Sequence, residues 1–244
     1  MTCGQGIAES GEDRVVPFSR RRAAIARRLT QSAQTIPHFY LSVDADVTAA
    51  LDWRSAYNDA RGTHVTVTDL VAKVTSLALR QFPRLNAHVG ADAVTLKAGV
   101  HLGLAVATAE GLLVPVIPDA DRLSLPALSE RIRRSVTGAR EGRLLAGPAG
   151  TFTLTSLGMY GVRLFLPLIN PPECAILAVG VAEPRVVPAP EGVAVRQMMT
   201  LTLACDHRAT DGAEAAQFLG TVKAELERIP DSLADWLGPE EATG

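Results

Sequence analysis

The sequence of 244 residues carries 24 lysines and arginines against 26 acidic residues, and 47% of it is hydrophobic. This composition is typical of a globular protein with a sizeable core, and it excludes disorder throughout the chain. Because positive charge is not in excess, the balance argues against nucleic acid as the main partner. No apolar run is long enough to cross a bilayer, and residues 1–13 lack the apolar centre of a signal peptide, so we expect no membrane partner.

The three cysteines, Cys3, Cys174 and Cys205, stand far apart and form no CxxC pair. An odd number at this spacing favours neither a disulfide framework nor a zinc site. We therefore expect no bound metal and a reducing, cytoplasmic location.

The chain begins with residues 1–13, whose composition predicts a flexible N-terminal tail. Ser19 then precedes the arginine-rich segment 20–29, in which apolar residues follow helical spacing. This pattern predicts a capped amphipathic helix whose arginines are either solvated or in contact with anions.

A strand and two helices follow in the first third of the chain. Alternation over 39–47 predicts the strand, and residues 52–58 are expected on a helix. Thr66 with Asp69 three residues later is typical of a capping box, so a second helix is predicted to begin there and to end before Pro83.

The middle of the chain alternates again between strand and helix patterns. Strands are predicted over 93–96 and 100–107. The apolar segment 111–118 contains two prolines, which favours a short strand at the edge of a sheet. An amphipathic helix over 125–136 and a loop over 138–150 are expected next.

The last third contains three strands and a long helix. The strands are predicted over 151–155, 175–181 and 198–205, and the helix over 212–229, ahead of a C-terminal tail at 236–244. Helices and strands interleave, and the late strands cluster. We therefore predict an α+β fold with one mixed sheet covered by helices on one face.

The segment DHRATDG, residues 206–212, lies between the last strand and the last helix, where such folds display reactive side chains. His207 can change charge near neutral pH and is the natural general base. Three charged residues surround it and could hold its orientation, namely Asp206, Arg208 and Asp211. Two structural alternatives remain open. Asp211 could cap the helix with Glu214 completing a capping box, and His207 could bond a backbone carbonyl.

Thr155 ends a predicted strand, where its hydroxyl could donate to a developing oxyanion or be an ordinary strand residue. A nucleophilic pair of Cys205 and His207 is a weaker alternative. The other histidines are expected to be structural, namely His38, His64, His88 and His101. No GxGxxG segment and no P-loop is present, so nucleotide-dependent chemistry has no support.

Together these segments resemble the catalytic domain of 2-oxo acid dehydrogenase E2 components, the dihydrolipoamide acyltransferases. The resemblance covers residues 14–235, which we expect to form one catalytic domain. Five segments carry it in order: SRRRAAIARRLTQSAQTIPHFYLSVDADVTA, GLLVPVIPDAD, TFTLTSLGMYGV, LPLINPPECAILAVG and DHRATDG.

The resemblance implies a two-layer fold like that of chloramphenicol acetyltransferase and a homotrimer that can assemble into a core of 24 or 60 subunits. It implies acyl transfer between dihydrolipoamide and coenzyme A at the interface between subunits. His207 matches the base that deprotonates the thiol, and Asp211 matches its supporting acid. Thr155, from the neighbouring subunit, matches the hydroxyl that stabilises the tetrahedral oxyanion.

The sequence departs from the family pattern in having no lipoyl domain and no Asp-Lys-Ala lipoylation turn. The lipoyl group is therefore expected in trans, from another lipoyl-bearing protein. Two alternatives stay open. One is a free-standing acyltransferase with an amine or alcohol acceptor, and the other is a non-catalytic assembly core.

Overall fold

A six-stranded mixed sheet forms the centre of the computed structural model, which describes residues 13–108, 111–143, 146–229 and 236. The strand order is β1-β10-β9-β8-β4-β7, and β8 runs parallel to both of its neighbours while the other pairs are antiparallel. The strands found in the described residues are β1 (His38–Asp46), β2 (Ala87–Val89), β3 (Val94–Leu96), β4 (Leu102–Leu104), β5 (Val106–Thr108), β6 (Gly111–Leu113), β7 (Val116–Ile117), β8 (Phe152–Ser156), β9 (Ala175–Ala189) and β10 (Gly192–Asp206).

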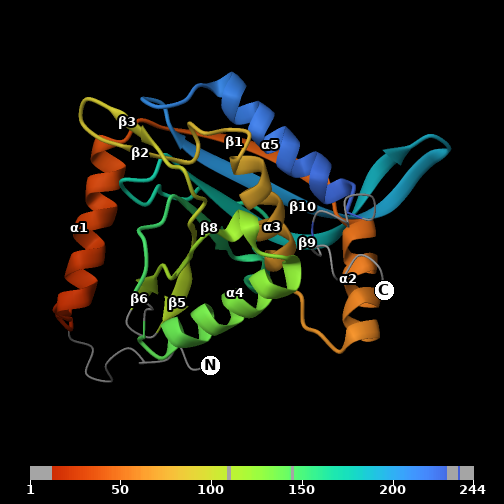
Figure 1. The fold of residues 1–244 in the computed structure, drawn as a ribbon, viewed down its shortest axis with the longest axis horizontal. Coiled ribbons are helices and arrows are strands. Elements are labelled where there is room, and N and C mark those ends of the chain that lie inside the picture. The colour runs from red at the N-terminus through yellow and green to blue at the C-terminus, as the bar shows by residue number, and fades with distance from the viewer. Residues whose placement is uncertain (1–12, 109–110, 144–145, 230–235, 237–244) are drawn as a thin grey trace.

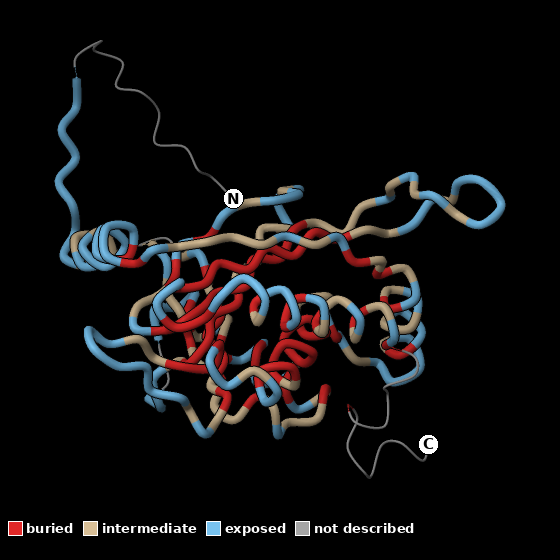
Figure 2. Tube along the Cα trace, turned by 90° about the horizontal axis from the view of Figure 1, so that it is seen from above, coloured by how far each residue is buried: buried red, intermediate tan, exposed pale blue. Residues whose placement is uncertain are grey.

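Four of the five α-helices in the described chain cover one face of this sheet, and the buried residues lie between the two layers (Figures 1 and 2). The helix α1 stands apart from the other four (Figure 1). The helices are α1 (Arg20–Thr35), α2 (Thr48–Arg61), α3 (Val67–Leu79), α4 (Leu125–Arg140) and α5 (Gly212–Glu227), with short 3₁₀ turns η1 (Ala120–Arg122) and η2 (Gly158–Tyr160). The predicted α+β class with helices on one face is confirmed.

Two of the predicted helix starts, at Ser19 and at Thr66, are confirmed in detail. Ser19 accepts a hydrogen bond from the backbone N–H of Arg22, so it caps α1. Thr66 and Asp69 bond each other's backbone N–H groups in a capping box at the start of α3. This helix ends at Leu79, a little before the predicted stop at Pro83, because the next residues form tighter turns with bonds to the third residue back.

The predicted strands over 100–107 and 111–118 each divide in two. Backbone bonds from Leu104 to Pro115 and from Ala105 to Leu154 hold the chain at the main sheet, after which β5 pairs with β6 in a separate ribbon. β7 then lies at the edge of the main sheet, as the prolines of this segment predicted.

The hairpin β9–β10 is much longer than the sequence predicted and projects from the body of the protein (Figures 1 and 2). Pro184 and Pro188 interrupt the strand pattern in the sequence. In this outer part of β9, however, the described residues pair only one edge of the strand, with β10, and prolines are tolerated where the other edge is free. Val186 and Val195 face each other across the ribbon and are exposed.

One described residue near the end of the sequence, Trp236, lies in the core. Trp236 is 2% exposed and packs with the main hydrophobic cluster, although it is the first residue of the segment expected to be a C-terminal tail. The other residues of that segment lie outside the described part of the structure, as do residues 1–12 of the expected N-terminal tail.

Candidate active site

His207 follows the last residue of β10 and lies in the turn that leads to α5. Its backbone N–H donates to the carbonyl of Pro37, and its ring contacts the Phe39 ring on β1 with the centroids 4.6 Å apart. The residue is exposed, and among the described residues the imidazole nitrogens have no hydrogen-bond partner. The ring is therefore held against an aromatic face with both nitrogens available to a substrate.

Asp211 begins α5 four residues after His207. Its Oδ1 accepts the backbone N–H groups of Ala213 and Glu214, both at 3.0 Å, so the predicted helix cap is confirmed. Glu214 does not complete a capping box, because its carboxylate accepts a hydrogen bond from the Thr210 hydroxyl. The bond from Glu214, with smaller effects from Ala213 and the nearby charges, lowers the pKa of Asp211.

The residues on either side of His207 bind each other. Asp206 is fully buried at the end of β10. Its carboxylate forms an ion pair with the Arg208 guanidinium, in which Oδ2 accepts a hydrogen bond from Nη2 at 2.6 Å. These hydrogen bonds raise the pKa of Arg208. The sequence placed both residues among charges that could hold His207, and the structure shows them paired with each other.

Thr155 lies on β8 and is not brought to His207 within one chain. It is level with Ala178 on β9, which is level with Thr202 on β10. Asp206 lies four residues beyond Thr202 along β10, which corresponds to about 13 Å, and the two sites are also two strands apart. The Thr155 hydroxyl makes no hydrogen bond to another described group, so it remains available as a donor.

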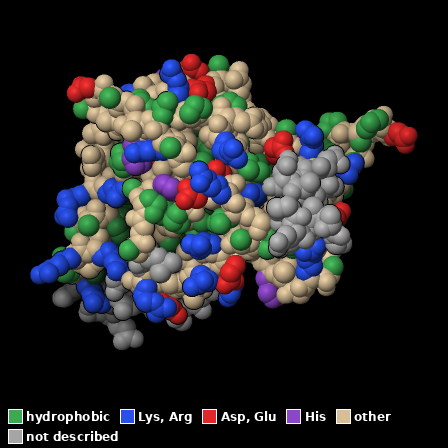
Figure 3. Space-filling model, viewed as in Figure 1, with side chains coloured by type: hydrophobic (Ala, Val, Ile, Leu, Met, Phe, Trp, Pro, Cys, Tyr) green, Lys and Arg blue, Asp and Glu red, His purple; other side chains and the backbone are tan. Residues whose placement is uncertain are grey.

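A cavity of about 470 Å³ opens beside Thr155 between β8, β5 and the helices α3 and α4. Its wall is mostly apolar, with Leu104, Ile132 and Leu154 among its side chains. Exposed Arg133 and Arg140 of α4 also line it. Arginines gather over α1 and α4 on the face shown in Figure 3. The cavity thus combines an apolar interior with a cationic border.

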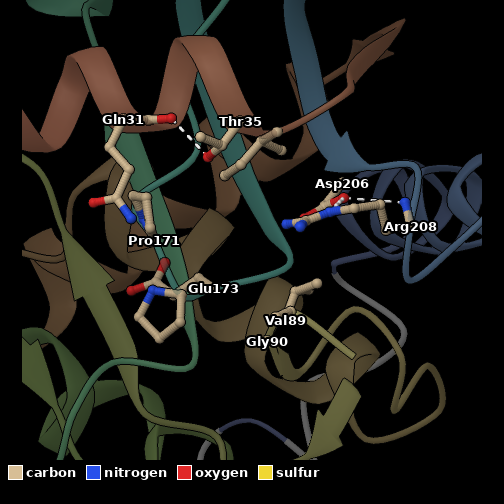
Figure 4. Close-up of a pocket in the computed structure, with 11 residues that line it drawn as sticks. Gln31, Thr35, Val89, Gly90, Pro171, Glu173, Asp206 and Arg208 are labelled. Atoms are coloured by element: carbon tan, nitrogen blue, oxygen red, sulfur yellow. Dashed lines mark hydrogen bonds and ion pairs between the residues drawn. The ribbon is translucent and has the colours of Figure 1, made fainter. Parts of the chain in front are cut away.

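A second cavity, of about 230 Å³, lies behind the His207 turn and is lined by Glu173 and Arg208 (Figure 4). Glu173 is buried, and its carboxylate accepts hydrogen bonds from Thr153 at 2.5 Å and from Asn170 at 2.9 Å. Burial raises the pKa of Glu173 to about 7. Glu173 was not among the residues predicted from the sequence, although a single acid within the apolar segment 166–180 is a signal that could have identified it.

The described cysteines and most of the other histidines are buried or bonded to the backbone, as expected of residues with a structural role. Burial raises the pKa of Cys205 far above the neutral range and that of Cys174 to about 12, so neither provides a thiolate at neutral pH. Backbone groups hold three of the histidines that were expected to be structural, namely His38, His88 and His101. His64 is exposed and lines the larger cavity.

Within the described residues, no group of histidines, cysteines and acids could hold a metal ion. None of the helices in the described residues has the length and hydrophobicity needed to span a membrane.

Comparisons with known proteins agree on one family. The family model for the 2-oxoacid dehydrogenases acyltransferase (catalytic domain) matches residues 10–234. Acetyltransferase component 3 of the mitochondrial pyruvate dehydrogenase complex of Arabidopsis thaliana is 41% identical, over 87% of this chain and 41% of its own length. The corresponding component of Rickettsia felis is 35% identical, over 88% of this chain and 54% of its own length. The chain thus spans about half the length of these relatives.

Solved structures give the same result. A dihydrolipoamide acetyltransferase from Azotobacter vinelandii, studied for the roles of a serine, a histidine and an asparagine in its catalytic mechanism, matches with a TM-score of 0.86 and 34% identity over 93% of this chain and 96% of its own. The cubic core of a pyruvate dehydrogenase multienzyme complex matches with the same values. Chloramphenicol acetyltransferase, at 12% identity and a TM-score of 0.52 over 85% of this chain and 95% of its own, confirms the expected fold. The chain belongs to the family of 2-oxoacid dehydrogenase acyltransferase catalytic domains.

Proposed function

We propose that the protein transfers an acyl group between coenzyme A and dihydrolipoamide, with His207 as general base and Thr155 as oxyanion donor. The spacing of the candidate residues carries this proposal. Thr155 and His207 are 52 positions apart, and Asp211 follows four positions later. The serine, histidine and asparagine studied in the Azotobacter vinelandii enzyme have the same separations.

The chemistry suits these side chains. Neutral His207 takes the proton of the attacking thiol, whose ordinary pKa is only about 8.5. The thiolate sulfur forms a bond to the thioester carbonyl carbon, and the Thr155 hydroxyl donates to the oxyanion. The intermediate then collapses, the original C–S bond breaks, and the leaving thiolate receives the proton from the His207 imidazolium.

The cavity beside Thr155 fits a long substrate arm with a charged end. Its apolar wall suits an acyl group or the pantetheine arm of coenzyme A, and Arg133 and Arg140 suit phosphate groups. Asp211 supports the site by capping α5 directly after the His207 turn.

Within a single chain His207 and Thr155 lie far apart, so a complete site requires a second copy of the chain. We propose a homotrimer that can build a 24- or 60-subunit core. Exposed apolar side chains follow Thr155 in the segment after β8 and offer a surface for that copy. They are Met159, Tyr160, Leu164, Leu166 and Leu168. The match to a cubic core supports this arrangement.

We place the protein in the cytoplasm, since Cys174 and Cys205 are free thiols. The lipoyl group comes in trans from a lipoyl-bearing protein, and the transfer requires no bound metal.

The test is acyl transfer from acetyl-, succinyl- and isobutyryl-CoA to free dihydrolipoamide, with His207→Ala as the control. Transfer that is lost in the variant supports the proposal and ranks the acyl groups. No transfer from any of the three donors, or undiminished transfer by the folded variant, contradicts it.

A further inference from the structure

His207 is held between two residues that bind each other. Asp206 Oδ1 accepts the backbone N–H of Arg208 at 3.0 Å and its Nε at 2.9 Å, while Oδ2 accepts Nε at 3.1 Å and Nη2 at 2.6 Å. The guanidinium lies alongside the carboxylate in Figure 4. The side chain of Asp206 is 1% exposed and that of Arg208 is 40% exposed. The ion pair therefore closes a small ring of which the His207 backbone is a part.

The backbone bonds of the turn also converge on Asp206. Its N–H donates to the carbonyl of Cys174, and its own carbonyl accepts the N–H groups of Ala209 and Thr210. The N–H of His207 donates to Pro37 on the other side. The turn is thus tied to two neighbouring segments, and Arg208 is the side chain that closes it.

We propose, on the basis of the proposed function, that the Asp206–Arg208 ion pair is the positioning device of His207. It aims the imidazole along the Phe39 ring, and it compensates the charge of the buried carboxylate. An uncompensated buried carboxylate is strongly unfavourable. Its negative charge, one residue from His207, would also favour the protonated ring, which cannot act as a base.

Arg208 is suited to this task in a way that other nearby charges are not. Of the described side chains, its guanidinium is the one that bonds the Asp206 carboxylate, and its planar fork matches the two oxygens. A lysine keeps the charge but cannot bond both oxygens in this way. Other charged or titratable groups near the turn, among the described residues, are His38 opposite Asp206 on β1, Arg84 after α3, Asp211 and Glu214 at the start of α5, and Glu173 across the smaller cavity.

Three variants of the assembled protein separate geometry from charge: Arg208→Gln, Arg208→Lys and the double variant Asp206→Asn/Arg208→Gln. We expect Arg208→Gln to lower kcat about tenfold or more with both KM values within about twofold, and to move the acid limb of kcat/KM about half a pH unit higher. Arg208→Lys should lower kcat and leave the limb in place. The double variant should return the limb to its wild-type position, because the uncompensated charge is gone.

Arg196→Gln is the matched control, since Arg196 is also on β10, is 49% exposed and faces Asp46 at 3.7 Å, remote from the His207 turn. Its kinetics should equal those of the wild type. Thermal unfolding of each variant confirms that the compared proteins are folded. If kcat and the acid limb stay unchanged in folded Arg208→Gln, or if KM rises in step with the loss of kcat, the positioning role is wrong.

A measurement without acyl substrates keeps this inference separate from the proposed function. Diethyl pyrocarbonate modifies neutral imidazole, and the difference between wild type and His207→Gln assigns the His207 signal. The midpoint of its rate against pH should rise in Arg208→Gln and return in the double variant. A wild type without transferase activity would refute the proposed function alone, whereas an unmoved midpoint would refute the role of Arg208.

Discussion

Thr155 has a proposed role that depends on one atom, its hydroxyl oxygen. Thr155→Val keeps the shape of the side chain and removes the donor, so kcat should fall about 10²- to 10³-fold, or roughly 3–4 kcal/mol of transition-state stabilisation. Thr155→Ser keeps the hydroxyl and should keep most of the activity. Single-turnover rates with saturating thioester measure both, and equal rates in the two variants would rule out an oxyanion donor at this position.

Glu173 makes the stability of the protein depend on pH. Its pKa is raised from the usual 4.5 to about 7, so the folded protein binds the proton more tightly than the unfolded chain. The resulting stabilisation is fully present below pH 4.5 and is lost as the pH rises through 7, by at most about 3 kcal/mol. Glu173→Gln should therefore reduce the fall in unfolding free energy between pH 5 and pH 8, measured in urea. The same fall in both proteins would disprove this role.

The residues of the site were predictable in unequal degree. His207 and Asp211 stand out in the sequence because they lie in the short connection between a predicted strand and a predicted helix. The pairing of Asp206 with Arg208 depends on the depth of a carboxylate below the surface, which a one-dimensional pattern does not contain. Glu173 was missed although its position, a single acid within the apolar segment 166–180, is visible in the sequence.

At the scale of elements, the start of α5 links helix stability to the site. Asp211→Asn keeps a side-chain acceptor for the two helix N–H groups, whereas Asp211→Ala removes it. We expect the alanine variant to lower Tm by a few degrees and the asparagine variant to change it little. Calorimetry of both proteins checks this, and equal Tm values would show that the cap does not stabilise the helix.

The helices were predicted better than the strands. Ser19, Thr66 and Asp69 are local signals, and each acts within one turn of its helix. The division of 100–107 into β4 and β5 depends instead on a bond from Ala105 to Leu154, far along the chain. The outer half of β9–β10 was not predicted because Pro184 and Pro188 are compatible with a strand only where one edge is free.

At the scale of the whole molecule, the separation of His207 from Thr155 predicts complementation between inactive variants. If each site takes His207 from one copy and Thr155 from the next, random one-to-one mixing of His207→Ala and Thr155→Val chains leaves about a quarter of the sites intact. Co-refolded mixtures should thus recover about a quarter of wild-type activity. Mixtures as inactive as the separate variants would place the site within one chain.

The fold class followed from the interleaved order of helices and strands, but the arrangement of copies did not. The surfaces that would meet carry apolar side chains such as Met159 and Leu166. Residues of these types are usually buried, so their sequence alone would predict a place in the core. Their exposure becomes visible only when β8 and the segment after it are placed in space.

The burial of Trp236 equips the protein with its own optical probe. The chain has two tryptophans, and the other, Trp53, stacks on Tyr57 within α2 at 4.9 Å. With Trp53 replaced by phenylalanine, the fluorescence of a single indole would report when residue 236 leaves the core. Comparing that emission with circular dichroism during denaturation would reveal whether Trp236 leaves the core before the rest of the fold unfolds or together with it.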